Sequence, residues 1–417
     1  MPQIQLKYGR TSIPFDYDED RFEVLRGSAD PPPLTDVEIG RKLDHAIGSL
    51  PLEERINPDE SVLLVVPDAT RQTGSGQIVN LLVRRLIAAG VAPFDITIIF
   101  ATGIHRQVTN AEKESILTPF IVQRIKTIDH GPRDLMQIVN VGETSGGIPV
   151  QLNRALVEHD HVILGGGIGF HYFAGFTGGR KLICPGLASS KTISATHKLA
   201  FDCETLDRRA GVGTGLLDGN AVHEAFVEAA SKIESVFCIS THVNDAGEVT
   251  DLFCGDLDTS HRAACDAYAA AHTIEIAEKR DVVIVSCGGL PHDMNMIQAH
   301  KALDAAANAC NDGGTIILLA ECADGLGRAD FLDWFNAADS HKLAEKLCQK
   351  YQVNGQTAWS LLRKAENFKI SVMASLPSET LAAMRLTKID GQNQIAARIA
   401  KTSHGYFITN GAKFMIA

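Results

Sequence analysis

A histidine, a run of glycines and one lysine follow an apolar segment in the middle of the chain. Residues 165–186 have the sequence GGGIGFHYFAGFTGGRKLICPG, and residues 161–164 before them are typical of the end of a buried strand. Glycines allow tight turns and let the backbone approach a ligand closely. We expect the amides around Gly178 and Gly179 to form an anion-binding concavity, with Lys181 supplying charge or a nucleophile. Taken alone, a glycine-rich loop with a solvated lysine is the simpler alternative.

Strand-like and helix-like segments alternate along the rest of the chain. The helix-like segments include residues 77–89 and 262–272. The strand-like runs are residues 61–67 (SVLLVVP), 95–101 (DITIIFA), 281–287 (DVVIVSC) and 315–320 (TIILLA). This alternation predicts βαβ units, and therefore an α/β fold with mostly parallel sheets.

Unusual residues fall where these strands end. In doubly wound sheets, ligands bind beyond the carboxyl ends of the strands. Four segments lie there: residues 68–71, residues 102–106 with His105, the glycine-rich segment with His171, and residues 288–291 followed by a helix with Gln298 and Lys301. If the strands lie side by side, these loops converge on one pocket.

Each candidate also has a structural interpretation. Asp68 and Arg71 would serve equally as a helix cap and a surface ion pair. A single histidine such as His105 is more often a hydrogen-bonded loop residue than a catalyst. Gln298 and Lys301, spaced i and i+3, share a helix face as many solvated pairs do. Their convergence is what favours function.

The composition indicates a globular protein whose main partner is not a polyanion. A length of 417 residues exceeds one ordinary core and predicts two domains. With 39 Lys and Arg against 50 Asp and Glu, the net charge of -11 argues against nucleic acid or an anionic membrane surface as the main partner. No apolar run approaches the roughly 18 to 20 residues of a spanning helix, and the first ten residues lack an apolar signal core. We therefore expect a cytoplasmic location.

We place the domain boundary near residue 275, after the predicted helix over residues 262–272. The first forty residues, with three consecutive prolines, resemble an arm that leads into a turn. The terminal segment GYFITNGAKFMIA is typical of a strand or hairpin and could return to the first domain. The domains are then residues 1–275 and 276–417.

The nine cysteines show no CxxC pair and no extracellular-type framework, so we expect most of them to be reduced core residues. They include Cys184, Cys203, Cys238, Cys254 and Cys287. The histidines give little support for a conventional metal site, because His171 and His197 lie 26 positions apart, unlike the i, i+4 spacing of a helical metal pair.

Together these motifs resemble the nickel-dependent lactate racemase family, which also includes other 2-hydroxy-acid racemases and sugar-acid 2-epimerases. The resemblance runs from about residue 5 to the end of the chain, and the block around GFTGGRK is its most specific part. The matching motifs are DATR at 68–71, ATGIHR at 101–106, HYFAGFTGGRKLICPG at 171–186, THK at 196–198, GNAVHE at 219–224 and GGLPHDMNMIQAHK at 288–301.

The resemblance implies a two-domain enzyme whose interdomain cleft holds a nickel-pincer nucleotide, a mononucleotide derived from nicotinate with two sulfur-bearing arms. Residues 1–275 would be the cofactor-binding and catalytic domain. Lys181 matches the lysine that is linked covalently to the cofactor, and His197 matches the single protein ligand to nickel. A square-planar nickel held mainly by its cofactor needs no cluster of protein ligands. Separate enzymes would make this cofactor.

The implied reaction inverts C2 of a 2-hydroxy acid. A base takes the hydroxyl proton while hydride passes to the cofactor, and the planar 2-keto acid accepts hydride on its other face. His105 and His171 match the two acid/base groups. Arg71 matches the residue that holds the substrate carboxylate, and the neighbouring Asp68, Ala69 and Thr70 complete a turn that contacts the cofactor. The positions of Gln298 and Lys301 match further substrate and cofactor contacts.

Some positions depart from the family pattern. Ile297 stands where a tyrosine is common in lactate racemase, so the resemblance does not assign lactate as the substrate. Gln72 and Ala221 each replace a common proline without removing proposed chemistry. Trp359 matches a tryptophan that lines the site in the family. The alternative interpretation, that Trp359 is a core aromatic residue, has equal weight.

Other classes of function make different demands on these residues. A sugar-acid 2-epimerase would use the same machinery on longer substrates. A zinc hydrolase or lyase would need His105, His171 and His197 as three ligands around an open position. A dehydrogenase with a dissociable nicotinamide lacks support, because no GxGxxG motif with a downstream acidic residue is convincing. A nucleotide-binding module without activity would make the histidines incidental.

Overall fold

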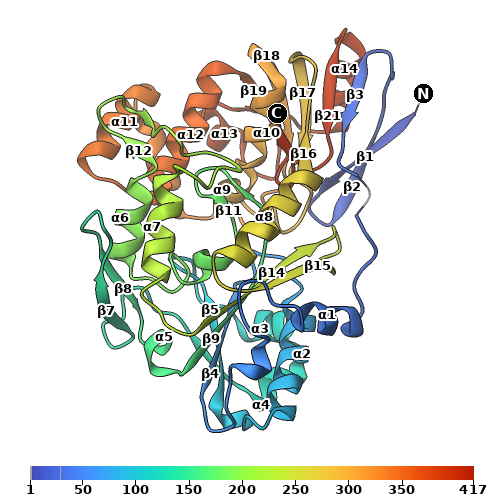
Figure 1. The fold of residues 1–417 in the computed structure, drawn as a ribbon. Helices are drawn as coiled ribbons and strands as arrows, with labels where there is room; N and C mark the ends of the chain where they lie inside the picture. Colours follow the sequence, from blue (N-terminus) through green and yellow to red (C-terminus); the bar gives the residue numbers. More distant parts are fainter. Residues whose placement is uncertain (1, 29) are drawn as a thin grey trace. The chain divides into compact units, whose positions relative to one another are not determined.

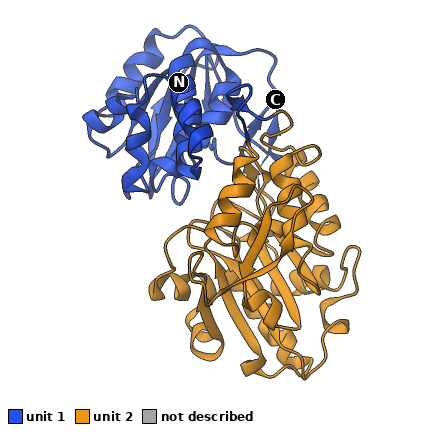
Figure 2. Ribbon diagram, turned by 90° about the vertical axis from the view of Figure 1, so that its left-hand side faces the viewer, with its two compact units in different colours: residues 1–28, 201–209, 271–417 blue, residues 29–200, 210–270 orange. Residues whose placement is uncertain are grey.

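The structure, a computed structural model, describes residues 2–28 and 30–417 and divides into two compact units (Figure 2). Unit 1 comprises residues 1–28, 201–209 and 271–417, and unit 2 comprises residues 29–200 and 210–270. Each unit contains a six-stranded sheet with helices beside it (Figure 1). The predicted α/β fold with mostly parallel sheets is therefore confirmed.

The sheet of unit 2 is parallel except at one edge, where the outermost strand runs antiparallel to its neighbour. Two of its central strands match the sequence predictions over residues 61–67 and 95–101 to within one residue. In spatial order the strands are β15 (Val249–Gly255), β14 (Val236–Val243), β9 (His161–Gly167), β4 (Val62–Pro67), β5 (Ile96–Ala101) and β6 (Lys126–Asp129).

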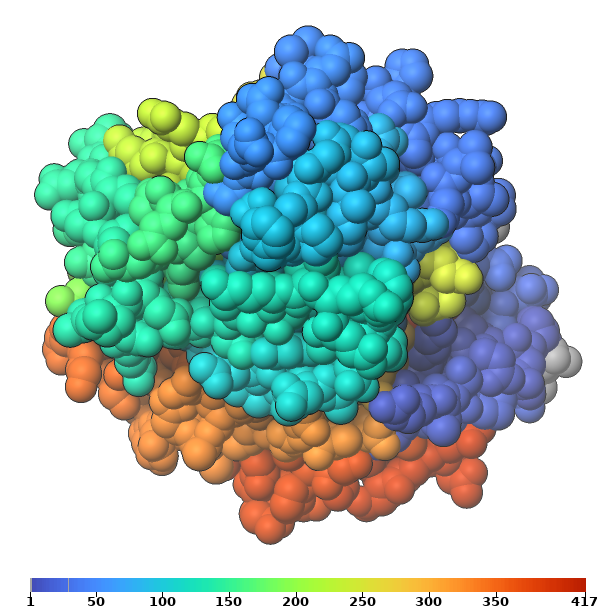
Figure 3. Space-filling view, turned by 90° about the horizontal axis from the view of Figure 1, so that it is seen from below, coloured from blue at the N-terminus to red at the C-terminus, as the bar shows by residue number. Residues whose placement is uncertain are grey.

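One face of this sheet packs against a layer of four helices. Alternate residues of β4, such as Val62, Leu64 and Val66, lie in a buried cluster with apolar residues of these helices. The helices are α1 (Asp36–Leu43), α2 (Ser75–Ala88), α3 (Asn110–Leu117) and α4 (Pro119–Arg124). Figure 3 shows this layer from outside, with the light-blue to teal residues of α2 to α4 gathered on one face of unit 2. Burial of both faces explains why β4 is apolar throughout.

The opposite face is covered by the glycine-rich segment and by three helices that follow it. The predicted helix over residues 262–272 is confirmed as the end of α8. These elements are the strand pair β10 (Phe170–His171) and β11 (Gly175–Phe176), the short helix η3 (Gly179–Leu182), α6 (Ser190–Lys198), α7 (Ala221–Ala230) and α8 (Thr259–His272). A hairpin of β7 (Ile138–Glu143) and β8 (Pro149–Asn153), with α5 (Ala155–Glu158), precedes them.

The sheet of unit 1 is parallel throughout. The predicted strands over residues 281–287 and 315–320 are confirmed as β17 and the second half of β18. In spatial order the strands are β20 (Thr387–Lys388), β19 (Lys369–Met373), β18 (Cys310–Leu319), β17 (Arg280–Ser286), β21 (Gly405–Ile408) and β3 (Phe22–Leu25).

Two separate buried clusters occupy the two faces of the unit 1 sheet. One contains residues of α9 (Met296–Ala299), α10 (Ala302–Ala309), η4 (Ala329–Asn336), α11 (Ser340–Gln349), α12 (Val353–Asn367) and α13 (Ser378–Ala383). The other contains residues of the hairpin β1 (Gln3–Tyr8) and β2 (Thr11–Asp16), and of α14 (Gln392–Lys401). Within residues 2–28 and 30–417, no helix has the length and apolar character needed to span a bilayer.

The division into units differs from the predicted boundary near residue 275 in two respects. Residues 1–28 belong to unit 1, because β3 pairs with β21 and the ring of Phe22 lies 5.2 Å from that of Phe407. Residues 201–209 also belong to unit 1. They form the strand pair β12 (Phe201–Asp202) and β13 (Asp207–Arg208), and the Phe201 ring packs edge-on against Trp359 at 5.0 Å.

The end of the chain stays within unit 1. The terminal strand β22 (Met415–Ile416) pairs in parallel with β16 (Thr273–Ile274). The residues of β16 precede the predicted boundary in sequence, yet they fold with the C-terminal part. We expected the terminal segment to return to the first domain. It pairs inside unit 1 instead.

The cysteines follow the prediction with one exception. Seven cysteines are free and buried, as expected for core residues. Cys203 and Cys348, however, form a disulfide that joins the strand pair β12–β13 to α11. The sequence analysis did not predict this pair, because the two residues lie 145 positions apart and match no spacing motif.

Candidate functional site

Asp68 and His105 meet at the carboxyl edge of the unit 2 sheet. β4 and β5 are neighbouring parallel strands, so the residues that follow them emerge side by side. Nδ1 of His105 lies 2.7 Å from Oδ2 of Asp68, and Thr70 donates its backbone N–H and its hydroxyl to Oδ1. Burial raises the pKa of Asp68, but His105, Thr70 and Arg71 outweigh it and lower that pKa to about 2. The carboxylate is therefore ionised and orients the imidazole.

Arg71 closes the same turn. Its backbone N–H donates to the Asp68 carbonyl, and Asp68 attracts its guanidinium electrostatically. Burial lowers the pKa of Arg71, although an arginine remains charged at any ordinary pH. Ala69 and Thr70 lie between them in the half-exposed part of the turn. The predicted cofactor-contacting turn thus carries a cation beside an ionised carboxylate.

The glycine-rich segment reaches this edge of the sheet because β9 lies directly beside β4. The N–H of Gly103 donates to the carbonyl of Gly186 at 2.8 Å, which joins the His105 loop to the end of the glycine-rich segment. The hydroxyl of Thr241 donates to the carbonyl of Thr73 at 2.8 Å, and it also lies 3.5 Å from the carbonyl of Gly166. The first three loops therefore lie next to one another at this edge of the sheet, and their convergence on one pocket stays a prediction.

His171 is buried at the end of β10, where a short turn returns the chain to β11. Phe173, in this turn, packs edge-on against the imidazole with ring centroids 4.5 Å apart. The backbone N–H of Ala174 donates to Nδ1 of His171 at 3.3 Å. The ring is thus held by a backbone contact within its own hairpin.

Lys181 and His197 lie against the same aromatic side chains. Nζ of Lys181 lies 5.6 Å from the ring centre of Phe173 and 5.1 Å from that of Phe226, and the His197 ring packs against both rings. Nδ1 of His197 lies 2.8 Å from the carbonyl of Ile193. Since a carbonyl only accepts, Nδ1 carries the proton and Nε2 carries the lone pair, which is the form that binds a metal. Burial and the charge of Lys181 lower the pKa of His197 to about 3, so this form is present at neutral pH.

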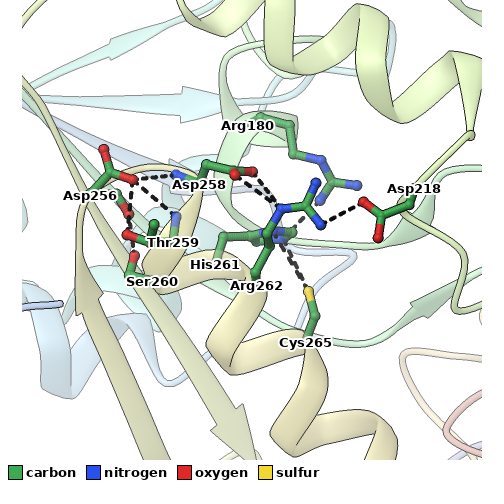
Figure 4. A network of polar contacts seen from close by, with 9 residues as sticks. All are labelled: Arg180, Asp218, Asp256, Asp258, Thr259, Ser260, His261, Arg262 and Cys265. Carbon is green, nitrogen blue, oxygen red and sulfur yellow. Dashed lines mark hydrogen bonds and ion pairs between the residues drawn. The ribbon is translucent and has the colours of Figure 1, made fainter. Parts of the chain in front are cut away.

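The residue before Lys181 is the most unusual buried group in unit 2. Arg180 is only 1% exposed and has no carboxylate among its hydrogen-bond partners (Figure 4). Its Nη2 donates to the Ala174 carbonyl at 2.8 Å, and its Nη1 lies 2.8 Å from Nε2 of His261. Burial lowers the pKa of Arg180 to about 10. The neighbouring Arg262, by contrast, is paired with Asp218 and Asp258.

Arg180 and Asn220 are site residues to which the sequence analysis gave no role. Asn220 is fully buried and caps α7, where its Oδ1 accepts the N–H groups of Val222 and His223. An asparagine before an apolar, alanine-rich run is a helix-start signal that would have found this cap. No sequence pattern would have shown the burial of Arg180, because charged residues are almost always exposed.

The fourth predicted segment belongs to the other sheet. Residues 288–291 follow β17, which is a strand of unit 1, so they do not extend the row of loops after β9, β4 and β5. Lys301 donates from Nζ to Oε1 of Gln298 at 2.6 Å, which confirms that this pair shares one face. Ile297 packs against the unit 1 core, and Trp359 is buried within that core.

Among the residues that the structure describes, the chain assembles no conventional metal site. In the parts that the structure describes, residues 2–28 and 30–417, no three His, Cys, Asp or Glu side chains are grouped to hold a metal ion. The zinc alternative, which required His105, His171 and His197 as a ligand triad, therefore lacks its site. A metal bound through His197 needs its remaining ligands from another molecule.

Comparison with known proteins places the chain in a family. Residues 8–207 match the lactate racemase N-terminal domain, and residues 276–406 match the lactate racemase C-terminal domain. The lactate racemase of Thermoanaerobacterium thermosaccharolyticum is 30% identical over 80% of this chain and 78% of its own length. The lactate racemase of Lactiplantibacillus plantarum is 33% identical over 81% of this chain and 79% of its own.

Solved structures agree with these sequence matches. The lactate racemase apoprotein from Thermoanaerobacterium thermosaccharolyticum superposes with a TM-score of 0.89 and 27% identity over 100% of both chains. A Thermotoga maritima protein, with a TM-score of 0.73 and 20% identity over 93% of this chain and 99% of its own, shares the fold. The chain therefore belongs to the lactate racemase family and is an isomerase of the racemase type.

Proposed function

We propose that this racemase inverts C2 of a 2-hydroxy acid by reversible hydride transfer, with a nickel-pincer nucleotide attached covalently at Lys181. One observation carries the proposal. Lys181 and a buried, neutral His197 lie against the same two aromatic rings, so the residues proposed as attachment point and single metal ligand are side by side.

The donor set fits such a cofactor. One histidine with an available Nε2, and no protein cluster around it among the described residues, suits a nickel ion whose other ligands are part of a bound nucleotide. Asp68, Ala69, Thr70 and Arg71 form the turn proposed to contact it. When bound, this cofactor supplies a hydride acceptor and a nickel centre.

The remaining residues bind the substrate and move its proton. The guanidinium of Arg71 would pair with the substrate carboxylate, and Gln298 and Lys301 would add polar contacts. His105 and His171 would serve the hydroxyl group. When its O–H proton passes to an imidazole and the C2 hydrogen leaves as hydride, a planar 2-keto acid remains. Return of hydride to the opposite face, with reprotonation of the oxygen, gives the other enantiomer.

Intact-mass and nickel analysis tests the attachment. The full chain is produced together with the cofactor-synthesis enzymes, beside a Lys181→Ala variant. We expect a mass adduct and nickel in the wild type and neither in the variant. Lys198→Ala removes an exposed lysine on the neighbouring helix and should keep both. His197→Ala should keep the adduct and lose nickel, and an adduct that survives in Lys181→Ala would refute the attachment.

The substrate is tested with a panel of single-enantiomer 2-hydroxy acids, from lactate to sugar acids, deuterated at C2. We expect inversion with the deuterium retained in the product, because hydride returns to the carbon that it left. Loss of the label to water would refute hydride transfer. Accumulation of free 2-keto acid would indicate a dehydrogenase.

A further inference from the structure

The disulfide between Cys203 and Cys348 lies at the surface of unit 1. Cys203 is exposed and Cys348 is half-buried, whereas the seven free cysteines are all buried. Structural disulfides resist reduction, while exposed ones are more often labile or regulatory. The position of this bond therefore indicates that a thiol can reach it in the folded protein.

The disulfide fastens a hairpin that is weak by itself. β12 and β13 pair over two residues each, and Asp202 lies directly opposite Asp207. Like charges in this position repel each other, and an isolated two-stranded hairpin is at best marginally stable. Leu206, in the turn between the strands, has a left-handed backbone with φ +56°. The hairpin therefore depends on the elements against which it packs.

Those elements are α11 and α12 of the same unit, beside which β12 lies in Figure 1. The buried ring of Phe201 packs edge-on against Trp359 of α12 at 5.0 Å, and the side chain of Leu206 contacts the same core. Asp207 pairs with Arg363, but these side chains are 41% and 44% exposed, and such a pair contributes little. The disulfide to α11 is the covalent part of this anchorage.

The hairpin continues directly from the helix that carries His197. α6 ends at Lys198, and the N–H of Ala200 donates to the carbonyl of His197 at 3.0 Å. The next residue, Phe201, begins the segment 201–209, which belongs to unit 1, whereas α6 belongs to unit 2. Helix ends fray when the chain beyond them is loose. Anchorage of the hairpin therefore steadies the last turn of α6, in which His197 lies.

We propose that Cys203 and Cys348 are a redox modification site, which a dithiol opens by reduction and a disulfide closes by the reverse exchange. With the protein disulfide formed, the hairpin is fixed on α11 and the last turn of α6 is ordered. With it reduced, the hairpin detaches from α11 and His197 is held less firmly. The consequence for nickel binding rests on the proposed function, whereas the consequence for the backbone does not.

The exchange takes two steps. A thiolate of the dithiol attacks the exposed Sγ of Cys203, so that a mixed disulfide forms and Sγ of Cys348 leaves as a thiolate. The second thiol of the reductant then attacks its own sulfur in the mixed disulfide and releases Cys203. Two electrons and two protons pass from the dithiol to the two cysteines, and the dithiol becomes a disulfide.

Amide hydrogen exchange of the full chain without cofactor, measured by mass spectrometry, tests the effect on the backbone. The wild type is compared before and after treatment with dithiothreitol. Reduction should speed the exchange of residues 199–209 by about tenfold or more, because the covalent constraint on the hairpin is lost. Helix α7 of unit 2 serves as the internal reference and should keep its exchange rate.

Variants separate the loss of the disulfide from other effects of the reagent. Cys203→Ser and Cys348→Ser should each exchange like the reduced wild type, both with and without dithiothreitol. Cys310→Ala removes a buried free cysteine of unit 1 and should respond to dithiothreitol as the wild type does. If one serine variant fails to fold, the other variant and the reduced wild type still give the comparison.

Two results would overturn the proposal. A disulfide that dithiothreitol reduces only in denaturant would not be an accessible modification site. Unchanged exchange of residues 199–209, in protein whose Cys203 and Cys348 are shown by mass to be reduced, would make the bond a simple crosslink.

The source of the dithiol is identified by adding a reduced Cys-x-x-Cys protein in an amount equal to the chain, beside the same concentration of dithiothreitol. Faster reduction by the protein would support the proposal with a protein dithiol as the source. Equal or slower reduction by the protein would support it with a small dithiol.

Nickel retention in the loaded enzyme tests the link to His197. The oxidised and reduced proteins are dialysed against a chelator, and the remaining nickel is measured over time. The reduced wild type should lose nickel faster, and glutathione disulfide should restore the slower loss. Equal rates of loss would refute the effect on His197. A wild type that takes up no nickel in either state would instead refute the proposed function and leave the exchange result standing.

Discussion

The carboxylate of Asp68 and the imidazole of His105 form one unit, since Oδ2 and Nδ1 lie 2.7 Å apart across the ends of two neighbouring strands. The carboxylate is buried and ionised, and the imidazole is about half exposed (46%), which suits the proposed acid/base role of His105. The relationship makes the two residues interdependent.

Replacement of Asp68 by asparagine should disable His105 without unfolding the protein. The amide no longer requires a proton on Nδ1 of His105, so Nε2 loses its assured lone pair. We expect kcat/KM for inversion to fall about 100-fold, a typical value for loss of a positioned proton-transfer group. Chiral chromatography of the product measures it. Asp36→Asn breaks the exposed ion pair with Arg84 elsewhere in unit 2 and should leave kcat/KM within about threefold, because surface pairs contribute little.

Acid should destabilise the cofactor-free protein in two steps. Burial and nearby cations lower the pKa of His223 to about 3, from an unfolded value near 6.5. Between these pH values the unfolded chain binds a proton that the folded chain does not, so the free energy of unfolding falls as pH drops. The slope is up to about 1.4 kcal/mol per pH unit for each such histidine. Asp68, with its pKa near 2, adds a further loss below about pH 4.

Urea unfolding at a series of pH values checks this prediction. His223→Gln should give a shallower decline between about pH 6 and pH 4 than the wild type, because one titrating group is removed. Exposed His341 provides the control, since His341→Gln removes a histidine that is not buried. Equal slopes in His223→Gln and the wild type would contradict the assignment.

Replacement by alanine should affect stability differently at two glycines with similar φ angles. Gly175 has φ +75°, and a Cβ there would lie 2.1 Å from the carbonyl of Leu216, whereas Gly219 has φ +71° and nothing within 4 Å. Gly219→Ala should lower the free energy of unfolding by about 1 to 2 kcal/mol, the cost of the left-handed backbone alone. Gly175→Ala should lower it by roughly 2 kcal/mol more. Similar values for the two variants would show that the β10–β11 turn has room to relax.

Mild reduction of the native protein should break the disulfide between Cys203 and Cys348 and expose these two thiols to a labelling reagent. Its seven other cysteines are buried, and burial raises the pKa of several of them, for example of Cys184 to about 12. We expect a thiol reagent to label no cysteine in the native oxidised protein and two after mild reduction. Cys203→Ser should lower the free energy of unfolding by about 3 kcal/mol. Native labelling of other cysteines would contradict their burial.

The sequence predicted those parts of the fold that depend on local pattern. β4 and β5 are apolar runs of strand length, and their shared edge follows from the rules of parallel sheets. The proximity of Asp68 to His105 could therefore be expected. The membership of residues 1–28 in unit 1 could not, because it depends on pairing between β3 and β21 at opposite ends of the chain.

The sequence also predicted only part of the candidate site, because only some of its residues belong to local patterns. Lys181, His197 and His171 carry recognisable motifs, and the structure groups them around Phe173. Arg180 acts through burial and backbone contacts, which no local pattern reveals. The helix-start signal at Asn220 predicts its cap but not the contact of its amide with the carbonyl of Phe173. The pairing of Cys203 with Cys348 is likewise a property of the folded unit and not of spacing.

The chain passes back and forth between the two units, and this order along the chain determines when each strand can pair during synthesis. The polypeptide passes from one unit to the other at residues 28/29, 200/201, 209/210 and 270/271. All strands of the unit 2 sheet have been synthesised once β15 ends at Gly255. β3 precedes every other strand of the two six-stranded sheets, and its partner β21 (Gly405–Ile408) follows all of them. Among the strands of the two sheets, the first to be synthesised is thus the last to find its partner, and its exposed edge is where a chaperone would be needed longest.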